Sequence, residues 1–124
     1  MEVEMKIRGL MMDPVTNMPI VILKDVSGAA VLPIWVGIYE ANAIALEIEK
    51  VSTPRPMTHD LMTALIATLE AEVKKITVTA LKNNTFYALL HLETKDGPKD
   101  IDSRPSDAIA LALRTDSPIF VTEE

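Results

Sequence analysis

The chain has 124 residues, a formal net charge of −6 and no cysteine. At this length we expect one domain, spanning residues 1–124. The lack of cysteine excludes disulfide scaffolds, zinc–thiolate sites and cysteine nucleophiles. An apolar content of 48% excludes a disordered chain. The acidic balance argues against a general nucleic-acid coat protein, although a local basic site can still sit on an acidic body.

Neither the N-terminus nor the longest uncharged segment indicates a membrane protein. Residues 26–39 carry no charge, but they are broken by Pro33 and are too few to span a bilayer, which takes about 20 apolar residues. The first residues alternate between charged and apolar side chains, unlike a signal peptide. We therefore expect a cytoplasmic protein that does not bind membranes.

The N-terminal part of the chain predicts three strands. Alternation of charged and apolar side chains indicates a strand over residues 2–8. Apolar runs bounded by turn residues indicate two more, over residues 19–23 and 30–36. Pro33 lies inside the third run, so we expect this strand at a sheet edge or at a bulge.

Two helices are predicted next. Apolar residues three and four apart indicate a helix over residues 39–51. A loop with two prolines separates it from a second helix over residues 58–73. Thr58 is the expected N-cap of this helix, with Asp60 in the first turn, where the helix dipole favours an acid.

The C-terminal part predicts three strands, a helix and a last strand. The three strands cover residues 75–81, 86–93 and 99–102, with a hairpin turn at Asn83-Asn84. A helix from Arg104 or Pro105 to Arg114 has an entirely apolar interior, so it should be buried on most sides; residues 119–121 form the final strand. The order β-β-β-α-α-β-β-β-α-β is typical of an α+β fold with a mostly antiparallel sheet and three helices.

Two similar segments, residues 55–60 and 104–107, are the least ordinary feature. In each, an Arg-Pro pair is followed by a hydroxyl and an acid at a helix start. The free N–H groups of a helix start attract anions, and the guanidinium of Arg can donate two parallel hydrogen bonds to the same anion. Each segment can therefore hold a phosphate-like group, with Thr58 or Ser106 as a further ligand. From spacing alone, simple capping and ion pairing are the more frequent roles of such residues.

The acids near these segments allow a metal site. Carboxylates beside a phosphate-binding Arg can hold Mg²⁺ or Mn²⁺ and orient a water for attack on a phosphodiester. Asp102 and Asp107 lie close in sequence, and Glu40 and Asp60 are further candidates. The alternative is a solvated acidic surface, which the net charge already predicts.

The histidines and aromatics offer fewer signals. His59 lies between a hydroxyl and an acid at a helix start, where it can act as a general base or acid or be an ordinary exposed residue. We interpret His91 as a surface residue. Aromatic residues make up 4% of the chain, so a stacking platform for single strands is hard to build. We expect Trp35 in the core or an interface rather than against a base.

Four blocks of sequence together resemble the bifunctional nuclease domain family. They are residues 32–37, the pair Glu40-Ala41, residues 55–61 and residues 101–112, in that order. The resemblance covers nearly the whole chain, and bacterial members of the family are short stand-alone domains like this one. It implies hydrolysis of phosphodiester bonds in both DNA and RNA.

The polar positions of these blocks are the site that the resemblance implies. Arg55, Arg104, Thr58 and Ser106 are the substrate-binding candidates. The catalytic candidates are His59, Asp60, Asp102, Asp107 and Glu40, of which Asp102, Asp107 and Glu40 are also the candidate ligands of Mg²⁺ or Mn²⁺.

Two other functions stay open at this point. One is a non-catalytic, homo-oligomeric binding or assembly module, with the last helix and the edge at residues 32–36 as its interface. The other is a binder of a small anionic ligand at one helix start.

Overall fold

The structure is a computed structural model that describes residues 2–82 and 85–122, except for the side chains of residues 80–82. The described part of the chain has the predicted α+β order. Its elements are β1 (Glu2–Met12), β2 (Pro19–Asp25), β3 (Val31–Trp35), α1 (Ile38–Ile48), α2 (Thr58–Thr68), β4 (Glu72–Lys82), β5 (Thr85–Thr94), β6 (Gly97–Ser103), α3 (Pro105–Thr115) and β7 (Ile119–Thr122). The order and the fold class are confirmed. The hairpin turn predicted at residues 83–84 lies outside the described residues.

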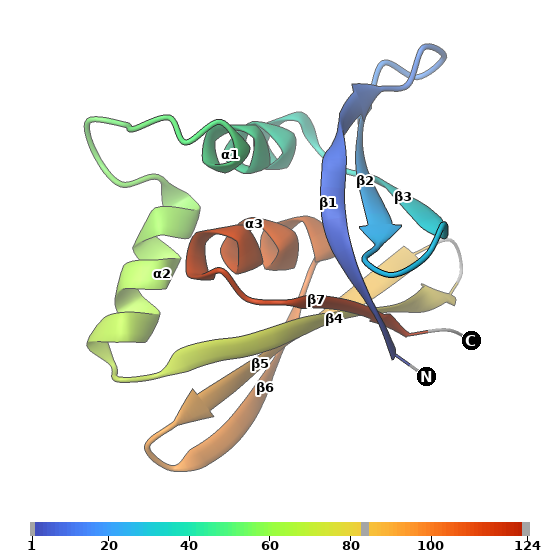
Figure 1. Ribbon diagram of the computed structural model, residues 1–124. Coiled ribbons are helices and arrows are strands. Elements are labelled where there is room, and N and C mark those ends of the chain that lie inside the picture. Colours follow the sequence, from blue (N-terminus) through green and yellow to red (C-terminus); the bar gives the residue numbers. More distant parts are fainter. Residues whose placement is uncertain (1, 83–84, 123–124) are drawn as a thin grey trace.

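The strands of the described residues form one sheet in the order β3-β2-β1-β7-β4-β5-β6 (Figure 1). Two meanders, β1–β3 and β4–β6, are joined by β7, which pairs antiparallel with β1 and parallel with β4. The sheet is therefore mostly antiparallel, as predicted. β3 lies at one edge, which explains how the sheet accommodates Pro33, because proline cannot donate a ladder hydrogen bond.

The helices of the described chain lie on the same side of the sheet, with α3 between α1 and the strands (Figure 1). Residues 108–112 of α3 are each at most 1% exposed, and their alanines allow the other helices to approach closely. The prediction of a helix buried on most sides is confirmed. This burial lies within one chain, so the last helix does not provide the oligomer interface suggested by its sequence. None of the described helices is long and apolar enough to cross a membrane.

Several element boundaries differ from the prediction for local reasons. α1 ends at Ile48 and α2 at Thr68, and soon after each helix one residue adopts a positive φ, Lys50 at 54° and Glu70 at 61°. This left-handed conformation reverses the chain. Val73, predicted in the second helix, therefore belongs to β4, where its apolar side chain is buried in the sheet.

Candidate active site

The starts of the three described helices bring four predicted residues together. Glu40 lies in the first turn of α1, His59 is the second residue of α2, and Asp107 lies in the first turn of α3. Arg104 directly precedes α3, and Pro105 occupies the first helical position, which its fixed φ suits. These residues meet because α3 packs against both other helices.

Asp107 is at the centre of a chain of polar contacts. Its Oδ1 lies 2.9 Å from Nε2 of His59, and its Oδ2 lies 2.8 Å from both Nε and Nη2 of Arg104. The same Nη2 lies 3.2 Å from Oε2 of Glu40. We call His59, Asp107, Arg104 and Glu40 the Asp107 cluster.

The charge of Asp107 sets the tautomer of His59. Burial acts to raise the pKa of the Asp107 carboxyl, but the hydrogen bonds and charges of Arg104 and His59 outweigh it, so this pKa lies below its ordinary value. The carboxylate is therefore ionised at neutral pH and can only accept hydrogen bonds. Nε2 of His59 must donate to it, which leaves Nδ1 with the lone pair when the ring is neutral.

The lone pair of His59 is accessible. Within the described residues Nδ1 has no hydrogen-bond partner, yet none of their buried side-chain nitrogen or oxygen atoms lacks one. It follows that Nδ1 is not completely buried, although only 7% of the His59 side chain is exposed. An imidazole held by a carboxylate at one nitrogen, with the other nitrogen open, has the geometry of a general base.

Arg104 is the exposed member of the Asp107 cluster. Its side chain is 65% exposed, against 7% for His59 and 24% for Asp107. The two carboxylates use Nε and Nη2, and Nη1 has no partner among the described residues. Arg104 is thus held at one side and has donors left for an external anion.

The two Arg-Pro segments differ at their helix starts. At α2, Oδ2 of Asp60 accepts the backbone N–H of Met57 at 2.9 Å, so that helix is capped. Thr58, the expected N-cap, is instead the first helical residue and is exposed. At α3 no side chain caps the first turn, and the N–H groups of Ser106 and Asp107 have no acceptor within the helix. Only the α3 start combines open N–H groups with an arginine of the cluster.

A cavity of about 570 Å³ opens beside the start of α3, within the size range of small-molecule sites. Trp35 and Phe86 line it, together with Arg104 and Ser106. Trp35 is 51% exposed, so of the two expected places, the core or an interface, the core is wrong. The cavity gives Arg104 an adjoining space in which a ligand can lie.

Asp60 belongs to a second ion pair. Its Oδ1 accepts a hydrogen bond from Nε of Arg114 at 2.7 Å, and the Arg114 side chain is only 5% exposed. Nη1 and Nη2 of Arg114 donate to the carbonyl oxygens of Ala110 and Ala43, each at 3.1 Å. Arg114 therefore joins α1, α2 and α3. The one sequence signal for this role is a single arginine in the last turn of an apolar helix.

Two other predicted residues lie apart from the Asp107 cluster. Arg55 is exposed in the loop that follows α1. Among the described residues its side chain forms no hydrogen bond or ion pair with the Asp107 cluster, although the loop leads into α2, whose second residue is His59; Figure 1 shows the loop beyond the end of α1. The structure does not bring the two arginines of the Arg-Pro segments together.

Asp102 lies on the other face of the sheet. It pairs with Leu89 of β5, which pairs with Thr77 of β4. The residues flanking Thr77, Ile76 and Val78, are fully buried in the core beneath the helices. Because side chains alternate along a strand, Asp102 points away from the helices and from Asp107.

A second polar chain crosses the sheet face that the helices leave open. Oγ1 of Thr77 lies 2.8 Å from Nε2 of His91, and Nδ1 of His91 lies 2.9 Å from Oδ1 of Asp100. His91 is therefore more than a surface residue, since its side chain is 24% exposed and links three strands. Sequence reasoning missed this chain because the partners meet only through strand pairing.

The donor set of the Asp107 cluster does not fit a divalent metal as it stands. Both oxygens of Asp107 and Oε2 of Glu40 already contact His59 or Arg104, and the guanidinium occupies the space between the two carboxylates. Asp102 lies on the other face. Within the described residues, no group of three or more His, Asp or Glu is arranged to hold a metal. Dependence on Mg²⁺ or Mn²⁺ stays a prediction.

The Asp60–Arg114 pair predicts a pH dependence of stability. The hydrogen bond from the Met57 N–H, and then that from Arg114, hold the pKa of Asp60 below its ordinary value. Its stabilising contribution is therefore complete above the pKa of the unfolded carboxyl, about 4, and is lost as the pH falls through the lower folded value. We expect Asp60→Asn to lower the free energy of unfolding at pH 7 by about 1 kcal/mol, because water screens a side chain that is 36% exposed.

This prediction is tested by urea unfolding of both proteins across pH. The difference between wild type and Asp60→Asn should shrink as the pH falls below about 4, where the wild-type carboxyl also becomes neutral. A difference that stays constant or grows in acid would show that the charge of Asp60 is not what stabilises the fold.

Comparison with known proteins decides the family of this chain. Residues 21–124 match the model of the bifunctional nuclease domain. The chain belongs to the bifunctional nuclease domain family. Over 120 residues it is also 42% identical to two uncharacterized proteins of Mycobacterium tuberculosis, from strains CDC 1551 and H37Rv; the match spans 97% of this chain and 71% of each relative. Both the Asp107 cluster and the cavity beside Arg104 lie almost entirely within the segment that matches the bifunctional nuclease domain.

Proposed function

We propose that this bifunctional nuclease domain hydrolyses phosphodiester bonds of DNA and RNA at the Asp107 cluster. The observation that carries the proposal is that Asp107 holds both the imidazole of His59 and the exposed Arg104, and that Arg104 lines a cavity. Family membership supports a nuclease-like activity. The acidic chain supports weak, salt-sensitive binding, because few cations are available to phosphates.

Each member of the Asp107 cluster has a distinct role in the proposed reaction. Arg104 and the open N–H groups of α3 bind the scissile phosphate. Nδ1 of His59 takes a proton from water, whose oxygen attacks phosphorus as the bond to the leaving oxygen breaks, and the leaving oxygen takes a proton from solvent. Asp107 positions the imidazole and stabilises its protonated form. Glu40 positions Arg104.

A cleavage assay tests this proposal. Purified protein is incubated with single- and double-stranded DNA and RNA, with EDTA, Mg²⁺ or Mn²⁺. We expect cleavage of both nucleic acids by wild type, with the rate falling as salt rises. An Arg104→Ala, Asp107→Ala double variant identifies contaminants. Equal cleavage by wild type and the double variant would show that the activity comes from a contaminant and not from this chain.

The metal arms of the assay decide a separate part of the proposal. We keep Mg²⁺ or Mn²⁺ as the proposed cofactor and assign it no ligand set, because Arg104 occupies the space between Asp107 and Glu40. Cleavage that requires either ion supports this cofactor. Full cleavage in EDTA shows that His59 and Arg104 suffice without it.

Exposed leucines favour a second property, self-association. Leu61, Leu65 and Leu69 are 53%, 53% and 73% exposed and recur every four residues along and just after α2, so they form one apolar stripe. We propose a homo-oligomer that buries this stripe, in a cytoplasmic protein. Sedimentation velocity should show an oligomer that Leu65→Glu converts to monomer, with Leu65→Met as the matched control. A wild-type monomer at high concentration would contradict the proposal.

A further inference from the structure

The cavity beside Arg104 has an apolar part and a polar part. Trp35 and Phe86 line the apolar part, with Met18 at the turn before β2. Nε1 of Trp35 donates a hydrogen bond to Oδ2 of Asp13 at 3.0 Å, which fixes the orientation of the indole. Much of the ring surface remains exposed. A flat, oriented aromatic ring favours a flat apolar ligand group, because such groups stack on it.

The polar part contains the hydroxyl of Ser106. Ser106 is only 7% exposed and lines the cavity, and its Oγ has no hydrogen-bond partner among the described residues. None of their fully buried side-chain oxygen atoms lacks a partner, so this Oγ keeps contact with solvent. The cavity is the opening that Ser106 lines. Its hydroxyl is therefore available to a ligand in the cavity.

Positive charge adjoins this hydroxyl. Nη1 of Arg104 has no partner among the described residues, and Arg104 also lines the cavity. The first turn of α3 carries no side-chain cap, so its N–H groups add donors for an anion. These donors lie at one part of the cavity, and the aromatic rings line another.

We infer that this cavity binds a nucleotide, with the base against Trp35 and the phosphate at Arg104, Ser106 and the start of α3. The inference rests on the proposed function, because it names the substrate group that the same site recognises. One ring and one cavity accommodate one base. The low aromatic content of the chain is thus compatible with base recognition, whereas it excludes a long stacking platform.

A preference among substrates follows from the cavity. A base within a duplex is stacked and paired, so it must leave the helix before it can enter a pocket, which costs a few kcal/mol. A base in a single strand or at a frayed end avoids this cost. The bifunctional nuclease domain should therefore bind single-stranded DNA and RNA more tightly than duplexes of the same sequence.

The single tryptophan of the chain provides a direct test, since Trp35 is the sole source of indole fluorescence. Wild-type protein in EDTA is titrated with AMP, adenosine and ribose 5-phosphate, with N-acetyltryptophanamide as the absorption control. We expect saturable quenching by AMP, weaker binding of adenosine, and no quenching by ribose 5-phosphate.

Variants separate the two parts of the cavity. Arg104→Ala should weaken AMP binding about 10-fold and leave adenosine unchanged, because a charged hydrogen bond to phosphate is lost. Phe86→Leu should weaken both ligands by a similar factor, about threefold. Arg55→Ala, in an exposed arginine that does not line the cavity, is the matched control and should change neither. Circular dichroism confirms that each variant is folded.

The inference is overturned if AMP gives no saturable quenching, if ribose 5-phosphate quenches equally, or if Arg55→Ala weakens AMP as much as Arg104→Ala does. AMP contains no internal phosphodiester, so binding is measured without turnover. Cleavage without quenching would leave the nuclease proposal standing and remove the base pocket. Quenching without cleavage would support the pocket as a site for a small anionic ligand and would contradict the proposed nuclease activity.

Discussion

Replacing His59 with alanine should lower kcat for phosphodiester cleavage by about 100- to 10,000-fold, with little change in KM. The reason is that Nδ1 of His59 is the accessible lone pair of the Asp107 cluster, whereas Arg104 and the start of α3 supply the contacts to phosphate. Steady-state cleavage of short single-stranded DNA and RNA substrates measures both constants.

His91→Ala is the matched control for this prediction. His91 is also part-buried and also bonded to a carboxylate, but it lies on the other face of the sheet. Its removal should leave kcat unchanged. His59→Asn, which keeps a polar side chain of similar size, separates loss of the base from loss of packing. If His59→Ala retains wild-type kcat, or if His91→Ala loses as much, the assignment of the base is wrong.

Arg114→Met should lower the free energy of unfolding by about 3 kcal/mol, the second large effect. The arginine is nearly fully buried and binds Asp60 and the carbonyl oxygens of Ala43 and Ala110, so it connects the described helices. Methionine fills a similar length but leaves these acceptors without their donor. Urea unfolding monitored by circular dichroism measures the change.

An exposed ion pair provides the comparison for Arg114. Nζ of Lys50 lies 3.2 Å from Oε2 of Glu47, and the Lys50 side chain is 78% exposed. Lys50→Met should therefore lower the free energy of unfolding by less than about 0.5 kcal/mol. A loss at Arg114→Met no larger than that at Lys50→Met would show that the buried pair does not hold the helices together.

The order of elements could be predicted because periodicity and turn residues are local signals. Alternation predicts strands, and Pro33 predicts either an edge strand or a bulge, of which the sheet has the edge strand. The ends of the helices were less predictable. Val73 continues the apolar helical pattern, but the left-handed conformation of Glu70 ends the helix before it. Such a reversal depends on tertiary packing, which cannot be predicted from a single residue.

The candidate site could be predicted in part. The Arg-Pro segment before α3 identified Arg104 and Asp107, and the start of α2 identified His59, because helix starts have recognisable residue patterns. Their convergence with Glu40 depends on the packing of α3, which the sequence does not specify. Asp102 lies near Asp107 in the sequence, but strand alternation turns its side chain to the other face of the sheet.

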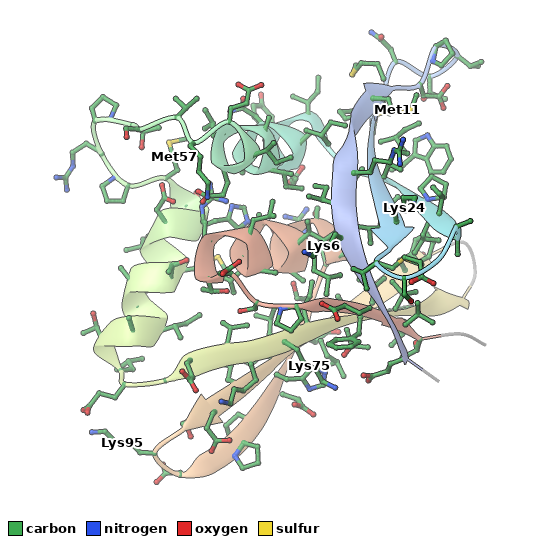
Figure 2. The ribbon with its side chains drawn as sticks, in the orientation of Figure 1. Lys6, Met11, Lys24, Met57, Lys75 and Lys95 are labelled. Atoms are coloured by element: carbon green, nitrogen blue, oxygen red, sulfur yellow. The ribbon has the colours of Figure 1, made fainter. Side chains whose placement is uncertain are left out.

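Residues whose partners are distant in sequence were not predictable. Arg114 and Asp60 are far apart in the chain and meet only when α2 packs on α3. His91 finds Thr77 and Asp100 through the pairing of three strands. Figure 2 shows that the labelled lysines are spread over the surface, with Lys75 on β4 and Lys95 in the turn between β5 and β6. Scattered cations of this kind explain why charge patterning did not single out a binding face.

The most direct test of the central claim compares cleavage by two arginine variants. Under single-turnover conditions, Arg104→Ala should reduce the rate of cleavage of a short single-stranded substrate by at least about 100-fold, because a phosphate contact made in the transition state is lost. Arg55→Ala, from the other Arg-Pro segment, should retain the wild-type rate. If Arg104→Ala cleaves as fast as wild type, or if Arg55→Ala loses as much, the Asp107 cluster is not the site of phosphodiester hydrolysis.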